Sequence, residues 1–205
     1  MEKQIIEIIN YMEYLFPNAG CELNYSTDYG FVISVMLSAQ TTDKAVNEVT
    51  KQLFNDFPTL ESLATSQPCQ IEPYIKRLGL SDIKSKNIVG IAQGILNNFY
   101  GHVPNNKEDL MKLPGVGNKT ANVVLAELFN IPQFAVDTHV TRVAKRLGFV
   151  SESDNVSIIE NKLKNIFEEK DYIHLHHLFI HFGRYFCKAS YPKCEECQIK
   201  QYCHK

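Results

Sequence analysis

The chain has 205 residues, enough for one large domain or two small lobes, and its hydrophobic (44%) and charged (21%) contents are those of an ordinary globular protein. A net charge of −2 excludes a strongly basic surface, so composition alone does not indicate a nucleic-acid partner. Charged residues in the first fourteen positions exclude a signal-peptide core, and no apolar run approaches the ~18 residues of a membrane span. We therefore expect a cytoplasmic protein that makes no membrane contact.

Apolar residues at three- and four-residue steps predict helices along most of the chain. In chain order these stripes lie in residues 5–15, 46–54, 88–99, 107–112, 118–129, 140–147 and 156–167. Residues 31–39 are almost all apolar, and periodicity does not separate a buried helix from a strand there. Because no other segment alternates with a period of two, we predict an all-α fold. Nothing resembles a flexible linker, so any two lobes are expected to pack directly on each other.

Basic residues gather in two places. Lys76, Arg77, Lys84 and Lys86 accompany a single acid, Asp82, and the tail from residue 184 carries five Lys or Arg against two glutamates. Each group is compatible with phosphate binding, and each is equally compatible with ordinary solvated lysines.

A tight turn, Leu113-Pro114-Gly115-Val116-Gly117, separates the helices predicted at 107–112 and 118–129. Pro114 ends the first helix, and the two glycines allow a left-handed or otherwise strained backbone. The second helix then begins with free N–H groups, which suit a phosphate of a nucleic-acid backbone. A plain helical corner would show the same glycines, so the turn alone does not decide between the two readings.

Lys119 favours the phosphate-binding interpretation because it lies in the first turn of the second helix. The positive helix terminus, together with partial burial, would disfavour the charged ammonium and free an amine for attack as a Schiff-base nucleophile. Asp137 precedes the helix predicted at 140–147 and is a natural N-cap. A carboxylate held by helix N–H groups stays ionised and could stabilise positive charge on a sugar as its base departs.

Four of the six cysteines crowd into the tail, in the pattern Cys187-x6-Cys194-x2-Cys197-x5-Cys203. Structural zinc sites usually show paired C-x2-C knuckles, so this spacing fits zinc poorly and suits a four-iron cluster. Such a group could serve electron transfer, or it could hold the basic loop that contains Lys188 and Lys193.

Together these motifs resemble the endonuclease III family of DNA glycosylases, in the helix–hairpin–helix superfamily. The matching segments are LSAQTTD at 37–43, LPGVGNKTANVVL at 113–125, AVDTHVTRVAKRL at 135–147 and HFGRYFC at 181–187, followed by the cysteine tail. The resemblance covers residues 21–203.

The resemblance implies two lobes. One is a six-helix barrel at residues 21–132 with the helix–hairpin–helix at 107–129, and the other joins residues 1–20 to 133–205 and holds a [4Fe-4S] cluster. It implies a monomeric, nucleoid-associated enzyme that binds double-stranded DNA with damaged bases or abasic sites across the cleft, with the lesion flipped out.

The resemblance also assigns roles to individual residues. Lys119 matches the family's nucleophile, Asp137 its catalytic carboxylate, and Leu80 its apolar wedge. Gln40 fills the gap left by the flipped base, and the cluster ligands are the four tail cysteines. The implied DNA contacts are Gln40, Leu80, Gly115, Val116, Gly117, Asn118 and, in a supporting role, His139.

Two departures from the family pattern stand out. Asn118 occupies a position that is commonly basic, and Ser81-Asp82 follow the wedge leucine where Tyr-Asn is common. The expected function is removal of oxidised pyrimidines with nicking by β-elimination. The alternatives are a mismatch-specific thymine or uracil glycosylase, a non-catalytic DNA-binding iron–sulfur protein, and an iron–sulfur electron carrier. An adenine glycosylase is disfavoured, since that group usually lacks the lysine and carries a further C-terminal domain.

Overall fold

The computed structural model describes residues 2–204, and these form helices and connecting turns with no strand among them. The all-α prediction is therefore confirmed. The chain divides into two compact units, one of residues Glu22–Ile131 and one that joins Met1–Cys21 to Pro132–Lys205. Within the described part of the chain, no helix is long and apolar enough to cross a membrane.

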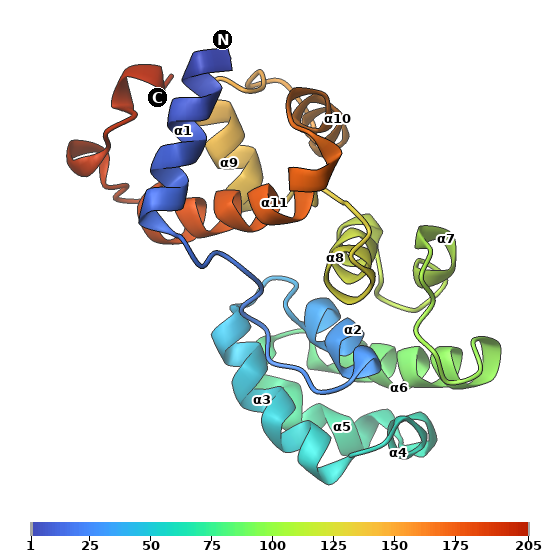
Figure 1. Cartoon of the computed structure of the whole chain (residues 1–205). Helices are drawn as coiled ribbons and strands as arrows, with labels where there is room; N and C mark the ends of the chain where they lie inside the picture. The colour runs from blue at the N-terminus through green and yellow to red at the C-terminus, as the bar shows by residue number, and fades with distance from the viewer. Residues whose placement is uncertain (1, 205) are drawn as a thin grey trace. The chain divides into compact units, whose positions relative to one another are not determined.

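The unit Glu22–Ile131 is a cluster of packed helices (Figure 1). Its helices are α2 (Asp28–Leu37), α3 (Asp43–Asp56), α4 (Leu60–Thr65), α5 (Pro68–Ile75), α6 (Ser81–Asn98), α7 (Lys107–Leu110) and α8 (Asn118–Phe129). The apolar run at 31–39, ambiguous in sequence, is mostly helix α2, and every residue from Gly30 to Leu37 is buried. It carries no polar stripe because α3, α6 and α8 all pack against it.

Helix α6 carries two glycines, one turn apart, that receive the 113–117 turn. A Cβ built on Gly90 would lie 2.7 Å from Cγ of Pro114, and one on Gly94 would lie 2.7 Å from Cδ2 of Leu113. These distances are shorter than real Cβ contacts, so the turn occupies the space that side chains would otherwise fill. The hairpin is thus seated on a rigid helix through a notch of small residues.

The second unit packs helices from both ends of the chain around one apolar core (Figure 1). Its helices are α1 (Glu2–Leu15), α9 (Thr138–Arg146), α10 (Val156–Ile166) and α11 (Tyr172–His181), followed by a π-helical turn at Phe182–Phe186. Phe134, Phe179 and Phe182 are fully buried in this core. Two tyrosine hydroxyls tie α1 to the cysteine tail: Tyr11 donates to the carbonyl oxygen of Glu196 at 3.0 Å, and Tyr202 donates to the carboxylate of Glu7.

Candidate active site

The turn before α8 uses its two glycines differently. Gly115 has a φ of +76°, and a Cβ there would lie 2.4 Å from Nδ2 of Asn87, so both backbone and space exclude a side chain. Gly117 has a φ of −93° and is the N-cap of α8, with no atom within 4 Å of a built Cβ. The prediction of a strained backbone is confirmed at Gly115. It is wrong at Gly117, whose backbone conformation any residue could adopt. The first helix of the hairpin, α7, is also shorter than expected and ends at Leu110.

The N-terminus of α8 has an open approach. Its N-cap is Gly117, which has no side chain to cap with, and Asn118 and Lys119 are exposed in its first turn. Val116 faces the opposite way, with its side chain buried and its amide donating to the carbonyl oxygen of Leu113 at 3.1 Å. The first-turn N–H groups of a helix that starts in this way suit a phosphate. Lys119 is exposed, so partial burial does not contribute to freeing its amine.

Asp137 is the N-cap of α9, as the sequence predicted. Its Oδ1 accepts hydrogen bonds from the amides of His139 and Val140, each at 2.8 Å, and the side chain is partly buried. Lys119 belongs to the unit Glu22–Ile131, and Asp137 belongs to the other unit.

His139 is held against the segment that leads into the cysteine tail. Nη2 of Arg142 lies 3.2 Å from Nδ1 of His139 and donates to the carbonyl oxygen of Gly183 at 2.6 Å, while Nε of Arg142 donates to the carbonyl oxygen of Cys187 at 3.0 Å. A Cβ on Gly183 would lie 3.0 Å from Cβ of His139, so glycine permits this close approach. Burial lowers the pKa of His139; Asp137 partly offsets this effect, and Arg142 and Arg184 add to it. The imidazole is therefore neutral at pH 7.

Gln40 and Leu80 lie at exposed loop tips in the unit Glu22–Ile131. Both have left-handed backbones, with φ of 59° and 52°. Neither is a glycine, and a bulky residue in this region is uncommon and strained. Strain of this kind concentrates at functional positions, which agrees with the roles that the resemblance assigns to them.

The basic group at residues 76–86 does not present all of its cations to solvent. Arg77 pairs with Glu48 at 2.7 Å and Lys86 with Asp82 at 2.9 Å, so these charges have carboxylate partners. Lys84 is buried and donates to backbone carbonyl oxygens. Sequence counting placed all of these cations on one face because it does not show which of them point inward.

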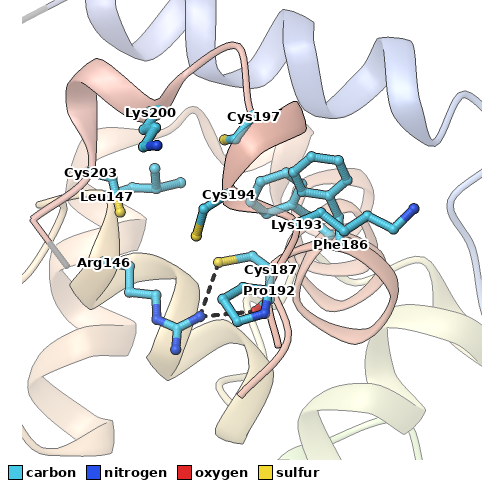
Figure 2. A pocket seen from close by; sticks show the side chains of 11 residues that line it. Arg146, Leu147, Phe186, Cys187, Pro192, Lys193, Cys194, Cys197, Lys200 and Cys203 are labelled. Atoms are coloured by element: carbon cyan, nitrogen blue, oxygen red, sulfur yellow. Dashed lines mark hydrogen bonds between the residues drawn. The ribbon is translucent and has the colours of Figure 1, made fainter. Parts of the chain in front are cut away.

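The four tail cysteines line one pocket. Cys187, Cys194, Cys197 and Cys203 form no disulfide and are partly buried, and Leu147 and Phe186 also line the pocket (Figure 2). Nη1 of Arg146, at the end of α9, donates to Sγ of Cys187 at 3.3 Å and to the carbonyl oxygen of Lys188 at 2.8 Å. Helix α9 therefore connects its N-cap, Asp137, to the cysteine pocket beside its last turn.

The donor set fits a polynuclear cluster better than a single ion. Among the described residues, no three His, Cys, Asp or Glu side chains gather closely enough to hold one metal ion. A four-iron cluster takes one thiolate on each iron, so its ligands surround a wider space. Burial raises the pKa of Cys197, and the other three thiols raise it further. A cationic group among the four sulfurs would favour their thiolate forms, and the Arg146 guanidinium beside Cys187 acts in the same direction.

Three residues of the site escaped the sequence analysis. Arg142 and Arg146 are four residues apart and so lie on one face of α9, which marks a shared target for their guanidinium groups. Lys84 lies four residues before Ile88, on the apolar stripe of its helix, which is the signal of a buried lysine.

Comparison with known proteins identifies the family. Residues 33–169 match the HhH-GPD superfamily of base excision DNA repair proteins. The chain is 46% identical to an endonuclease III of Rickettsia felis over 187 residues, which are 91% of this chain and 87% of that protein. It is 42% identical to an endonuclease III of Bacillus subtilis over 99% of this chain and 93% of the relative. The chain belongs to the endonuclease III family.

Solved structures agree with this family assignment. A non-covalent endonuclease III–DNA complex matches with a TM-score of 0.96 at 41% identity, over 100% of this chain and 95% of that one. A trapped endonuclease III–DNA covalent intermediate matches with a TM-score of 0.95 at 41% identity, over 100% and 96% of the two chains. A thermostable thymine-DNA glycosylase, at 22% identity and a TM-score of 0.82, shares the fold.

Proposed function

We propose that this chain removes oxidised pyrimidines from double-stranded DNA and then nicks the strand 3′ to the abasic site through a Schiff base on Lys119. As a member of the endonuclease III family it is a DNA glycosylase and abasic-site lyase of base excision repair. The observation that carries the catalytic assignment is the position of Lys119, exposed in the first turn of helix α8, whose N-cap Gly117 directly follows the hairpin turn.

The reaction uses one amine and breaks, in turn, the bond from C1′ to the base, the C1′–O4′ bond, a C2′–H bond and the bond from C3′ to the phosphate oxygen. The Nζ lone pair of Lys119 attacks C1′ as the bond from C1′ to the base nitrogen breaks and the base leaves with that electron pair. The nitrogen lone pair then forms the C1′=N double bond as the C1′–O4′ bond breaks, and the ring oxygen takes up a proton and remains on C4′ as a hydroxyl. A proton lost from C2′ leaves its electrons to form the C2′–C3′ double bond, and the 3′ phosphate departs by β-elimination. Each step uses the same amine, so one lysine supports both base release and nicking.

The other residues hold the DNA and the charge. The α8 terminus binds a backbone phosphate through Gly115, Gly117 and Asn118, which grips DNA without reading its sequence. Asp137 supplies negative charge as positive charge grows on the sugar, and His139 supports it as a neutral group. Gln40 and Leu80 enter the space left by the extruded nucleotide, which costs a few kcal/mol and least at a damaged base.

We also assign the lobes and the cofactor. The barrel lobe is the unit Glu22–Ile131 and carries the lysine, and the other lobe carries the aspartate and a [4Fe-4S] cluster. Cys187, Cys194, Cys197 and Cys203 hold the cluster, with Arg146 donating to Cys187. When bound, the cluster supplies a four-point crosslink of the tail and a redox-capable centre. A brown protein with equal amounts of iron and labile sulfide supports this assignment, and a colourless zinc protein rejects it.

The test is a panel of duplexes that each carry one lesion, scored separately for base release and for strand nicking. Wild type should release thymine glycol and nick, whereas Lys119→Ala should do neither. Lys51→Ala, an exposed lysine of α3, controls for the loss of one positive charge and should match wild type. Base release without nicking by wild type would contradict the lyase assignment, and activity only on mismatched thymine or uracil would replace the substrate class.

A further inference from the structure

Lys84 is buried and holds three backbone carbonyl groups. Its side chain sits in α6 with only 4% exposure, and Nζ donates to the carbonyl oxygens of Leu37 at 3.1 Å, Ala39 at 3.0 Å and Leu78 at 3.3 Å. An ammonium has three N–H groups, so these three bonds use all of them. This burial lowers the pKa of Lys84 below that of a solvated lysine. Burying a cation costs free energy, and its hydrogen bonds to these carbonyl groups offset that cost.

Of the three acceptors, Leu37 is the last residue of α2, and Ala39 and Leu78 each lie within two residues of a strained, exposed residue. Ala39 immediately precedes Gln40, and Leu78 lies two residues before Leu80. Gln40 and Leu80 both have left-handed backbones, and Leu80 is 57% exposed. The backbone amide of Lys84 also donates to the carbonyl oxygen of Leu80 at 2.9 Å. Lys84 therefore holds the backbone beside both Gln40 and Leu80 by hydrogen bonds.

We propose that Lys84 is a positioning residue that locks the Gln40 loop to the Leu80 loop, so that both side chains enter damaged duplex DNA as one preformed unit. This rests on the proposed function, which gives Gln40 and Leu80 their place in the helix. Side chains that are already ordered lose little conformational entropy when they bind, so a preformed pair favours insertion. Charge-assisted hydrogen bonds are roughly twice as strong as neutral ones, which suits them to hold two strained tips.

The experiment compares binding to two duplexes: one undamaged, and one with a tetrahydrofuran abasic analogue that lacks the C1′ hydroxyl and so resists the lyase step. 2-Aminopurine opposite the analogue reports unstacking by its fluorescence. Lys84→Met keeps the length of the side chain and removes the ammonium. It should bind undamaged DNA as wild type does, lose about ten- to a hundredfold of the preference for the analogue, and show a reduced fluorescence rise at saturating protein. Lys51→Met is the matched control and should behave as wild type.

Two results would overturn the proposal. One is a folded Lys84→Met protein with an unchanged preference and fluorescence rise, and the other is equal weakening on both duplexes, which indicates a general loss of structure. A wild-type protein without any preference for the analogue contradicts the proposed function instead.

A second measurement leaves Lys84 in place and applies even if Lys84→Met does not fold. If the two tips act as one unit, Gln40→Ala and Leu80→Ala should be strongly non-additive, and the double variant should lose little more preference than the weaker-binding single variant. Additive losses would mean that the tips act independently, which contradicts a coupling role for Lys84.

Discussion

Asp137 carries two roles that substitution can separate, the cap of α9 and a fixed negative charge. Its Oδ1 accepts from the amides of His139 and Val140, each at 2.8 Å. Asp137→Ala removes the acceptor and the charge together. Asp137→Asn keeps an oxygen that can accept both hydrogen bonds and removes only the charge, since Asn and Asp cap helices about equally well.

The two variants should differ in stability and agree in activity. Loss of an N-cap costs about 1 kcal/mol, within a range of about 0.5–2, which for a chain of this size lowers Tm by roughly 2–4 °C. Asp137→Asn should lose only the interaction of charge with the helix terminus, about 0.3–1 kcal/mol. Removing a group that stabilises the transition state costs about 10²–10³ in rate, so both variants should be slowed by at least about a hundredfold.

Single-turnover base release from a thymine glycol duplex, beside thermal unfolding of the same preparations, measures both quantities. The expected result is an Asp137→Asn protein that melts close to wild type and is nearly inactive. If Asp137→Asn retains the wild-type rate, the charge has no catalytic role and Asp137 is a cap only. If both variants melt as wild type does, the capping energetics are wrong.

Further predictions concern the hairpin and His139. Gly115→Ala should lower the free energy of unfolding by about 1–3 kcal/mol, because its Cβ would lie 2.4 Å from Asn87 at a φ of +76°. Gly117→Ala should leave the free energy of unfolding in urea within about 0.5 kcal/mol of wild type, since nothing lies within 4 Å of its built Cβ. It should weaken DNA binding, because the added methyl group lies before the α8 terminus. Equal losses of stability in Gly115→Ala and Gly117→Ala would contradict this geometry. Gly90→Ala should destabilise the protein although alanine gains about 1 kcal/mol of helix propensity, because its Cβ would lie 2.7 Å from Pro114. A more stable variant would contradict the close packing of the turn on Gly90. His139 has a folded pKa below its ordinary value of 6.5, so the unfolded chain binds more protons and stability is lost as pH falls below about 6.5 through the folded pKa. Urea unfolding at several pH values should show that the free energy of unfolding falls less toward acid pH in His139→Asn than in wild type. The same pH dependence in both proteins would contradict the burial of this ring.

The sequence predicted the helical fold and the hairpin because these depend on local pattern. Three- and four-residue steps indicated most helices, and the Asp137 cap followed from its place before an apolar stripe. The run at 31–39 stayed ambiguous, because α2 is surrounded on all sides and therefore has no polar face to show its period. Gly117 was misjudged because composition does not reveal which glycine of a turn needs a positive φ.

The residues that escaped prediction act through contacts distant in sequence. Gly90 and Gly94 look like weak points in a helix until the turn at 113–114 is placed on them. Lys84 was counted as a surface charge, although its acceptors at Leu37 and Ala39 lie more than forty residues away. The contact of Arg146 with Cys187 likewise joins two segments that only the folded unit brings together.

The central claim is that the amine of Lys119 forms the covalent intermediate. Borohydride reduction during turnover of a thymine glycol duplex, followed by proteolysis and mass spectrometry of the crosslinked peptide, locates the attachment directly. The account predicts one adduct, carried by the peptide that contains Lys119 and absent from Lys119→Ala. An adduct on another lysine, or on the N-terminal amine, would contradict it.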